Sequence, residues 1–167
     1  RFGPESKEAG NALCSLGLAY QDFGDYAKAR DTYERALPIR ERNYGSFSPW
    51  VAELLGNIGN AHGALGDYAK ERDMQERALA MYEGGCGKDH ISVGITLGDL
   101  GTAYANLGDH AKARDMQERA LKIKEREYGS DHPDVAITLG NLGNAYGELG
   151  DHAKQRDMLE RALAINE

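Results

Sequence analysis

The feature that most constrains this sequence is a segment that recurs every 42 residues. Its clearest copy begins at Leu139 and reads Leu-Gly-Asn-Leu-Gly-Asn-Ala-Tyr. Related segments begin at Leu97, Leu55 and Leu13, and their alignment needs no insertion or deletion. A fixed period of about 20–50 residues is typical of stacked structural units that bury their core against their neighbours. The chain is therefore expected to be a short array of repeats.

Each copy has the pattern of two helices. In the fourth copy the apolar residues from Val135 to Leu149 follow one another in steps of four and three, the spacing of one helix face. Gly150 and Asp151 then separate two helices, because Gly favours a helix end and Asp a helix start. The expected helices span residues 8–23, 26–43, 50–65, 68–83, 92–107, 110–127, 134–149 and 152–165.

The repeat sets the expected division of the chain. Residues 1–167 form one array, with a partial linker at 1–7, repeat 1 at 8–49, repeat 2 at 50–91, repeat 3 at 92–133 and a truncated repeat 4 at 134–167. The chain starts without Met, partway through a linker, and stops before the next linker. We therefore expect a fragment of a longer array.

These motifs resemble the tetratricopeptide repeat (TPR) family. The resemblance rests on Leu-Gly followed by an aromatic residue, Gly-Asp at the turn, and Ala-Leu on the second helix. The usual unit has about 34 residues, and the longer unit with its linker at 129–136 resembles kinesin light chain repeats. The Leu-Gly-Asn core also resembles the Pins/LGN adaptors. The resemblance implies an all-α, right-handed α-solenoid of antiparallel helix pairs, whose first helices line a concave groove for an extended or helical partner segment.

A polar stripe runs beside the apolar stripe of each first helix and is expected to face this groove. Asn side chains dominate it, and because Asn both donates and accepts, a ladder of Asn can hold the backbone of a partner with little regard to its sequence. The similar families use Asn in this way. Alternatively, these Asn residues bond within or between neighbouring helices. The candidate partner-binding residues are Asn57, Asn60, Ile95, Asp99, Thr102, Asn106, Ile137, Asn141, Asn144 and Glu148.

One glycine position recurs inside every first helix. An interior Gly costs about 1 kcal/mol relative to Ala, so its repetition indicates that the two helices of a unit approach closely there. The glycines are Gly17, Gly59, Gly101 and Gly143. The small partners expected on the second helix are Ala36, Ala78, Ala120 and Ala162.

Charge limits the classes of partner. The formal net charge of −7 argues against nucleic acid or an anionic membrane, and no apolar run approaches the ~20 residues of a membrane span. From residue 10 onward no expected first helix contains Lys or Arg. The acidic cargo of kinesin light chains and the carboxylate clamp of co-chaperone repeats therefore do not carry over. We expect a protein or peptide segment that is neutral or basic, held with Ile95 and Ile137 as apolar anchors.

No enzyme, cofactor or metal site is predicted. Residues 84–88 read Gly-Gly-Cys-Gly-Lys, but the first Gly and the Ser or Thr of a phosphate loop are missing, so this stretch is expected to be a flexible linker that ends a helix. The histidines recur singly, without a second ligand nearby, and the carboxylates alternate with Lys and Arg on faces expected to be solvated. Two isolated cysteines and no signal peptide favour a cytoplasmic location.

The leading hypothesis is a non-catalytic scaffold that binds another protein in its groove. The alternative is a structural array that pairs end to end to form homo-oligomers, because the last helix would expose Leu159 and Leu163. Trp50, the only Trp, replaces the Asp134 of the last repeat at the start of a helix. It either packs on the preceding helix or is an exposed contact residue.

Overall fold

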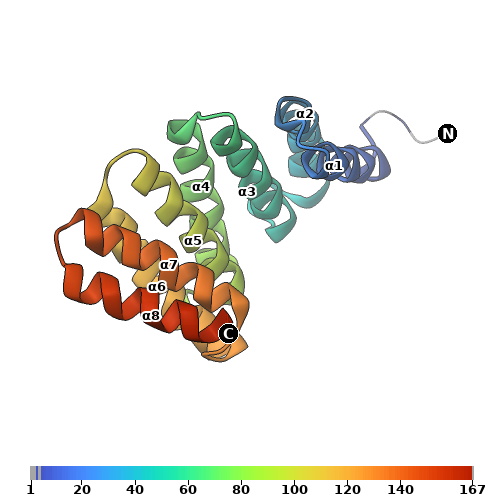
Figure 1. Ribbon diagram of the computed structural model, residues 1–167. Coiled ribbons are helices and arrows are strands. Elements are labelled where there is room, and N and C mark those ends of the chain that lie inside the picture. The colour runs from blue at the N-terminus through green and yellow to red at the C-terminus, as the bar shows by residue number, and fades with distance from the viewer. Residues whose placement is uncertain (1–2, 4, 167) are drawn as a thin grey trace. The chain divides into compact units, whose positions relative to one another are not determined.

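The computed structural model describes residue 3 and residues 5–166 of the chain (Figure 1). The described residues form eight α-helices and no strand. The helices are α1 (Lys7–Asp22), α2 (Tyr26–Tyr44), α3 (Pro49–Ala64), α4 (Tyr68–Cys86), α5 (Ile91–Asn106), α6 (His110–Tyr128), α7 (Pro133–Glu148) and α8 (His152–Asn166). The predicted all-α class is confirmed, and each predicted helix end lies within three residues of the observed one. The partial linker expected at 1–7 and the end of repeat 4 at residue 167 fall partly outside the described residues.

Side chains at the helix starts satisfy backbone N–H groups that have no partner within the helix. Four aspartates at the turn between paired helices each accept a hydrogen bond from the N–H three residues on: Asp25, Asp67, Asp109 and Asp151. At the linker position, His90 and His132 accept through Nδ1 from the second residue on, at 3.2 and 3.1 Å. The repeated histidines of the linker therefore act as helix caps.

Glycines with a left-handed backbone end the helices. Gly150 has φ of 82°, and the glycines at equivalent turns are similar. The end of α4 differs from the prediction, because the helix continues through Gly84 and Gly85 to Cys86 and stops at Gly87, where φ is 88°. Gly87 shares its repeat position with Gly45 and Gly129, so the cap of the repeat, and not the nearer glycine pair, decides where this helix ends.

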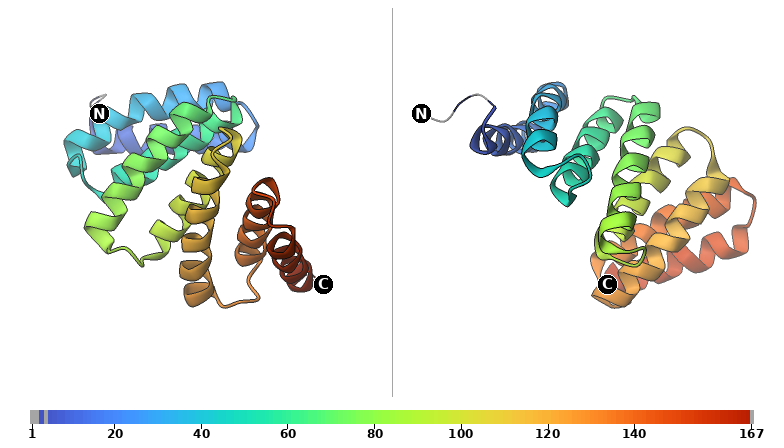
Figure 2. Two further views of the ribbon diagram at one scale, coloured as in Figure 1. Left: turned by 90° about the vertical axis from the view of Figure 1, so that its left-hand side faces the viewer. Right: turned by 180° about the vertical axis from the view of Figure 1, so that it is seen from behind.

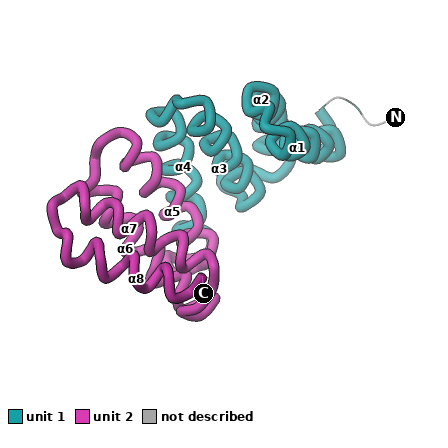
Figure 3. Tube along the Cα trace, in the orientation of Figure 1, with its two compact units in different colours: residues 1–85 teal, residues 86–167 magenta. Residues whose placement is uncertain are grey.

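The chain divides into two compact units, unit 1 at residues 1–85 and unit 2 at residues 86–167 (Figure 3). In unit 1, α1 pairs with α2, and α2 packs on α3. In unit 2, α5 pairs with α6 and α7 with α8, while α6 packs on α7. Figure 2 shows these helical hairpins from two further sides.

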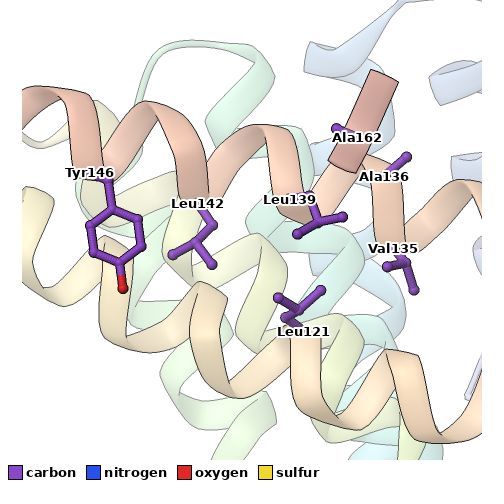
Figure 4. Close-up of a cluster of buried hydrophobic side chains, with 7 residues drawn as sticks. All are labelled: Leu121, Val135, Ala136, Leu139, Leu142, Tyr146 and Ala162. Carbon is purple, nitrogen blue, oxygen red and sulfur yellow. The ribbon is translucent and has the colours of Figure 1, made fainter. Parts of the chain in front are cut away.

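The apolar stripe of α7 forms the core of unit 2, as the sequence predicts. Leu139 and Leu142 are 0% and 2% exposed and lie between α6 and α8 (Figure 4). The full cluster contains Leu121, Val135, Ala136, Leu139, Leu142, Tyr146 and Ala162. Residues from three helices complete this core, so neither hairpin of unit 2 buries it alone.

The repeated glycine position is a point of close helix approach, but the predicted alanine partners are wrong. A Cβ atom added to Gly17 would lie 2.3 Å from the ring of Tyr33, and one added to Gly143 would lie 3.1 Å from Leu159 Cγ. The neighbours of the four glycines share one repeat position, three residues before the predicted alanines: Tyr33, Gln75, Gln117 and Leu159. The alanines are buried beside this contact. The glycine makes room for a large side chain that crosses its helix.

Candidate functional site

The predicted partner-binding residues lie at the accessible face of the first helices. Asn57 and Asn60 are half-buried on α3 of unit 1. In unit 2, α5 carries Ile95, Asp99, Thr102 and Asn106, and α7 carries Ile137, Asn141, Asn144 and Glu148. None of the ten is buried, and the two isoleucines are 43% and 62% exposed.

Half of these residues meet in one pocket of unit 2. The pocket has a volume of about 350 Å³ and lies between α5, α6 and α7. Its predicted members are Thr102, Asn106, Asn141, Asn144 and Glu148. Helix α6 adds His110, Ala113 and Gln117, which the sequence analysis did not include. A repeat of 42 residues places the first helices in register, but it does not show which side chains of a second helix reach between them.

A pocket of about 310 Å³ lies between α1, α2 and α3 in unit 1. Asn57 is its one residue from the predicted set. The other lining residues are Asn11, Cys14, Ser15, Leu18, Arg40, Tyr44, Trp50 and Glu53. Several of them occupy the same polar stripe of the earlier repeats, so both pockets are formed from equivalent helix faces.

The predicted asparagines differ in whether their side chains make hydrogen bonds inside the protein. Asn60 Oδ1 accepts a hydrogen bond from Gln75 Nε2 at 2.6 Å, which matches the alternative interpretation of an intramolecular role. Among the described residues, the side chains of Asn57, Asn141 and Asn144 have no such bond. Their amides are available for a partner, because each can donate and accept at once.

Two basic side chains reach the first helices from the second helices, a feature that the sequence analysis missed. Arg40 lines the unit 1 pocket, and its Nη1 donates to Trp50 O at 2.8 Å and lies 3.6 Å from Glu53 Oε2. Lys124 Nζ in unit 2 donates to Thr138 Oγ1 at 3.1 Å. From residue 10 onward the first helices themselves carry no Lys or Arg, but the second helix α2 supplies one basic group to the unit 1 pocket.

Lys124 also corrects the assignment of its charged run to solvent. It is 9% exposed, and burial lowers its pKa below the ordinary value. The signal for this placement was present in the repeat. Lys124 and Arg40 share one repeat position, one helical turn after the buried Ala120 and Ala36.

Trp50 combines its two predicted alternatives. Its ring centroid lies 6.0 Å from that of Tyr44 on the preceding helix, and 54% of the residue remains exposed. It lines the unit 1 pocket. An aromatic side chain with one packed face and one accessible face is suited to contact a partner.

The two cysteines are not joined by a disulfide bond. Cys14 is buried and Cys86 exposed, and both are free thiols. No group of three or more His, Cys, Asp or Glu residues within the described ranges is arranged to hold a metal ion. Among the same residues, no helix has an apolar stretch long enough to span a bilayer.

Comparison with solved structures gives close matches of fold. BtubC (BKLC) from P. vanneervenii is 28% identical with a TM-score of 0.86, over 94% of this chain and 63% of that one. Thus the chain spans less than two thirds of BtubC. Kinesin light chain TPR-like repeats from Podosopora anserina are 22% identical with a TM-score of 0.79, over 99% and 78% of the two chains. A comparison with curated protein sequences gives no match.

The predicted resemblance to kinesin light chain repeats is thus confirmed, whereas the resemblance to Pins/LGN adaptors is not shown. The tetratricopeptide repeat profile matches residues 8–84 and 86–167, two segments that together cover nearly all of the eight helices. With nearly its whole length covered by these two matches, the chain belongs to the tetratricopeptide repeat family.

Proposed function

We propose that this chain is a non-catalytic scaffold that holds an extended or helical segment of another protein against its first helices. Proteins of this family generally act as protein–protein interaction scaffolds. The observation that carries the proposal is the convergence of Thr102, Asn106, Asn141, Asn144 and Glu148 on one pocket of unit 2.

The amides of Asn141 and Asn144 support a role in holding a backbone. Neither side chain makes a hydrogen bond within the described residues, and both line the pocket wall on α7. When a partner segment lies along α7, its backbone N–H and C=O groups would replace the water molecules bonded to these amides. The neighbouring Ile137, 62% exposed on the same helix, would supply an apolar contact.

The charges of unit 2 favour a neutral or basic segment. Glu148 is exposed at the pocket, Asp99 lies on the same face of α5, and no Lys or Arg lines the pocket. Electrostatic complementarity of this kind sets partner choice and association rate more than affinity. We place the protein in the cytoplasm, a reducing compartment in which the thiols of Cys14 and Cys86 persist.

The test is binding of peptides selected from a random displayed library against the full chain. We expect Asn141→Ala/Asn144→Ala to lower the affinity of the selected peptides roughly 30-fold, from two hydrogen bonds of about 1 kcal/mol each. Asn43→Ala is the matched control, because Asn43 lies on α2 and lines neither pocket. Equal affinities for the wild type and the α7 double variant would contradict the proposal.

A second candidate function is self-association through α8. Leu159 and Leu163 are 40% and 59% exposed there and line a shallow apolar depression. Leu121 of α6 occupies the same repeat position as Leu163. It is 8% exposed and packs against α7. A second copy could cover α8 as α7 covers α6. Sedimentation over a range of concentrations tests this, with Leu163→Lys expected to abolish any rise in mass and a constant monomer mass of the wild type contradicting it.

A further inference from the structure

The floor of the unit 2 pocket contains a buried amide whose acceptor atom is unpaired. Gln117 on α6 is 1% exposed and lines the pocket. Its Nε2 donates to the backbone oxygen of Gly98 at 2.9 Å, so that half of the amide is held by α5. Its Oε1 accepts no hydrogen bond from any described residue. A buried acceptor without a donor costs about 1–3 kcal/mol, so a ligand that brings a donor to this floor is favoured.

Part of the wall of the same pocket is formed by small apolar residues. Gly101 and Ala105 belong to α5, Ala113 to α6 and Ala145 to α7, and none has a side chain larger than a methyl group. Such walls accommodate an unbranched aliphatic chain, whereas they offer no aromatic face for stacking. The volume of about 350 Å³ is at the lower end of the range of binding pockets in proteins.

The mouth of the pocket is negative. Glu148 is exposed there, and the amide oxygens of Asn141 and Asn144 add acceptors. The remaining titratable group is His110, whose Nε2 lies 4.0 Å from Glu148 Oε2. The pocket thus combines acceptors at the floor, a carboxylate at the mouth and methyl groups between them.

We propose that this pocket receives a lysine side chain of the partner segment. The aliphatic stem packs against Ala105, Ala113 and Ala145, and the ammonium donates to Gln117 Oε1 while Glu148 supplies the opposite charge. A compact ammonium on a flexible stem fits these dispersed acceptors, whereas a planar guanidinium requires two acceptors in a fork. This inference rests on the proposed function and specifies the chemistry of the partner at one point.

In repeat 1 the space equivalent to this pocket is occupied by side chains of the protein itself. There Tyr33 replaces Gln117, Gln21 replaces Ala105, and the hydroxyl of Tyr33 donates to Gln21 Oε1 at 3.2 Å. Ala64 stands where α7 has Glu148. The same lysine pocket is therefore not expected between α1, α2 and α3, and Ala105→Gln introduces a residue that repeat 1 already has at this position.

The test uses the full chain and Nα-acetyl-lysine-N-methylamide as the probe, with the norleucine analogue as a control of equal stem length without the ammonium. Binding is followed by NMR through the side-chain amide signals of Gln117, Asn141 and Asn144. We expect the lysine probe to shift these signals and the norleucine probe to leave them in place. Glu148→Gln should weaken binding of the lysine probe roughly two- to fivefold, as for a surface ion pair, and Ala105→Gln should abolish it.

Equal shifts with both probes, no shift with the lysine probe, or unchanged binding to Ala105→Gln would each overturn the lysine pocket. The selected peptides separate this inference from the proposed function. If their affinity depends on Asn141 and Asn144 but survives replacement of every lysine by norleucine, the lysine pocket is wrong and the scaffold proposal stands. If the lysine probe binds while the double Asn variant keeps full peptide affinity, the pocket stands and the Asn contacts are wrong.

Discussion

Tyr146 on α7 donates the hydrogen of its hydroxyl group to Glu118 Oε1 on α6, a bond that joins the first helix of one hairpin to the second helix of the preceding hairpin. The equivalent pair in unit 1 is His62 and Glu34, whose Nε2 and Oε1 atoms lie 3.3 Å apart. The same repeat positions therefore link successive hairpins in both units, through a phenol in one and an imidazole in the other.

The Tyr146 bond is expected to stabilise the stacking of α7 on α6. Tyr146→Phe removes the hydroxyl and should lower the free energy of unfolding by about 1–2 kcal/mol, because the acceptor is a carboxylate. Tyr20 occupies the same position in repeat 1 and makes no hydroxyl hydrogen bond within the described residues, so Tyr20→Phe is the control and should change stability little. Urea unfolding of the three proteins measures the difference, and equal losses in both variants would contradict this role.

Two tyrosines should titrate above the ordinary pKa of a phenol. Burial raises the pKa of Tyr33 to about 12, and the hydrogen bond to Glu118 raises the pKa of Tyr146 to about 12, from an ordinary value of 10.0. A folded-state pKa above the unfolded one means that the neutral form is favoured on folding. The associated stability is complete below pH 10 and is lost as the pH rises toward 12. Phenolate absorbance measures this titration, and Tyr146→Phe should remove one late-titrating group.

Two helix glycines should respond to alanine with opposite signs. A Cβ atom at Gly140 would meet nothing within 4 Å, so Gly140→Ala should raise stability by about 0.5–1 kcal/mol through helix propensity. A Cβ atom at Gly17 would lie 2.3 Å from the Tyr33 ring, and Gly17→Ala should lower stability by about 1–3 kcal/mol through overpacking. Thermal unfolding of both variants checks the sign, and a stabilised Gly17→Ala would show that α1 and α2 do not need this close approach.

The buried ammonium of Lys124 should lower the free energy of unfolding at neutral pH. Burial lowers its pKa from 10.5, so the unfolded chain binds the proton more strongly and stability rises as the pH approaches 10.5. Lys124→Met keeps the aliphatic volume and should raise stability by about 1 kcal/mol near neutral pH. Thr138 Oγ1 keeps its bond to Asp134 O at 2.8 Å.

Unfolding of Lys124→Met as a function of pH measures this effect, with Lys122→Met as the exposed control on the same helix. The gain should shrink as the pH rises. A destabilised Lys124→Met at every pH would show instead that the ammonium is needed for the contact with Thr138.

Local signals in the sequence determined the helices, their caps and their buried faces. Steps of three and four placed Leu139 and Leu142 in the core, and Asp151 and Gly150 marked a turn, because spacing and backbone preference act within a few residues. The polar stripe that carries Asn141 and Asn144 followed from the same helical geometry. The helix end that differs most from the prediction, at Cys86, arose because Gly87 provides the cap that Gly84 and Gly85 do not.

Only the tertiary structure decided which side chains of the second helices lie between the first helices. Packing brought Gln117 and Arg40 from second helices into the candidate pockets and placed Lys124 against Thr138. It also turned Asn60 toward Gln75 and placed Tyr33 against Gly17. These contacts join residues far apart in the chain, and each depends on the length and shape of a side chain that crosses a helix interface. Periodicity specifies the face of a helix on which a residue lies, whereas the fit of neighbouring side chains decides whether that residue is used inside the fold or left for a partner.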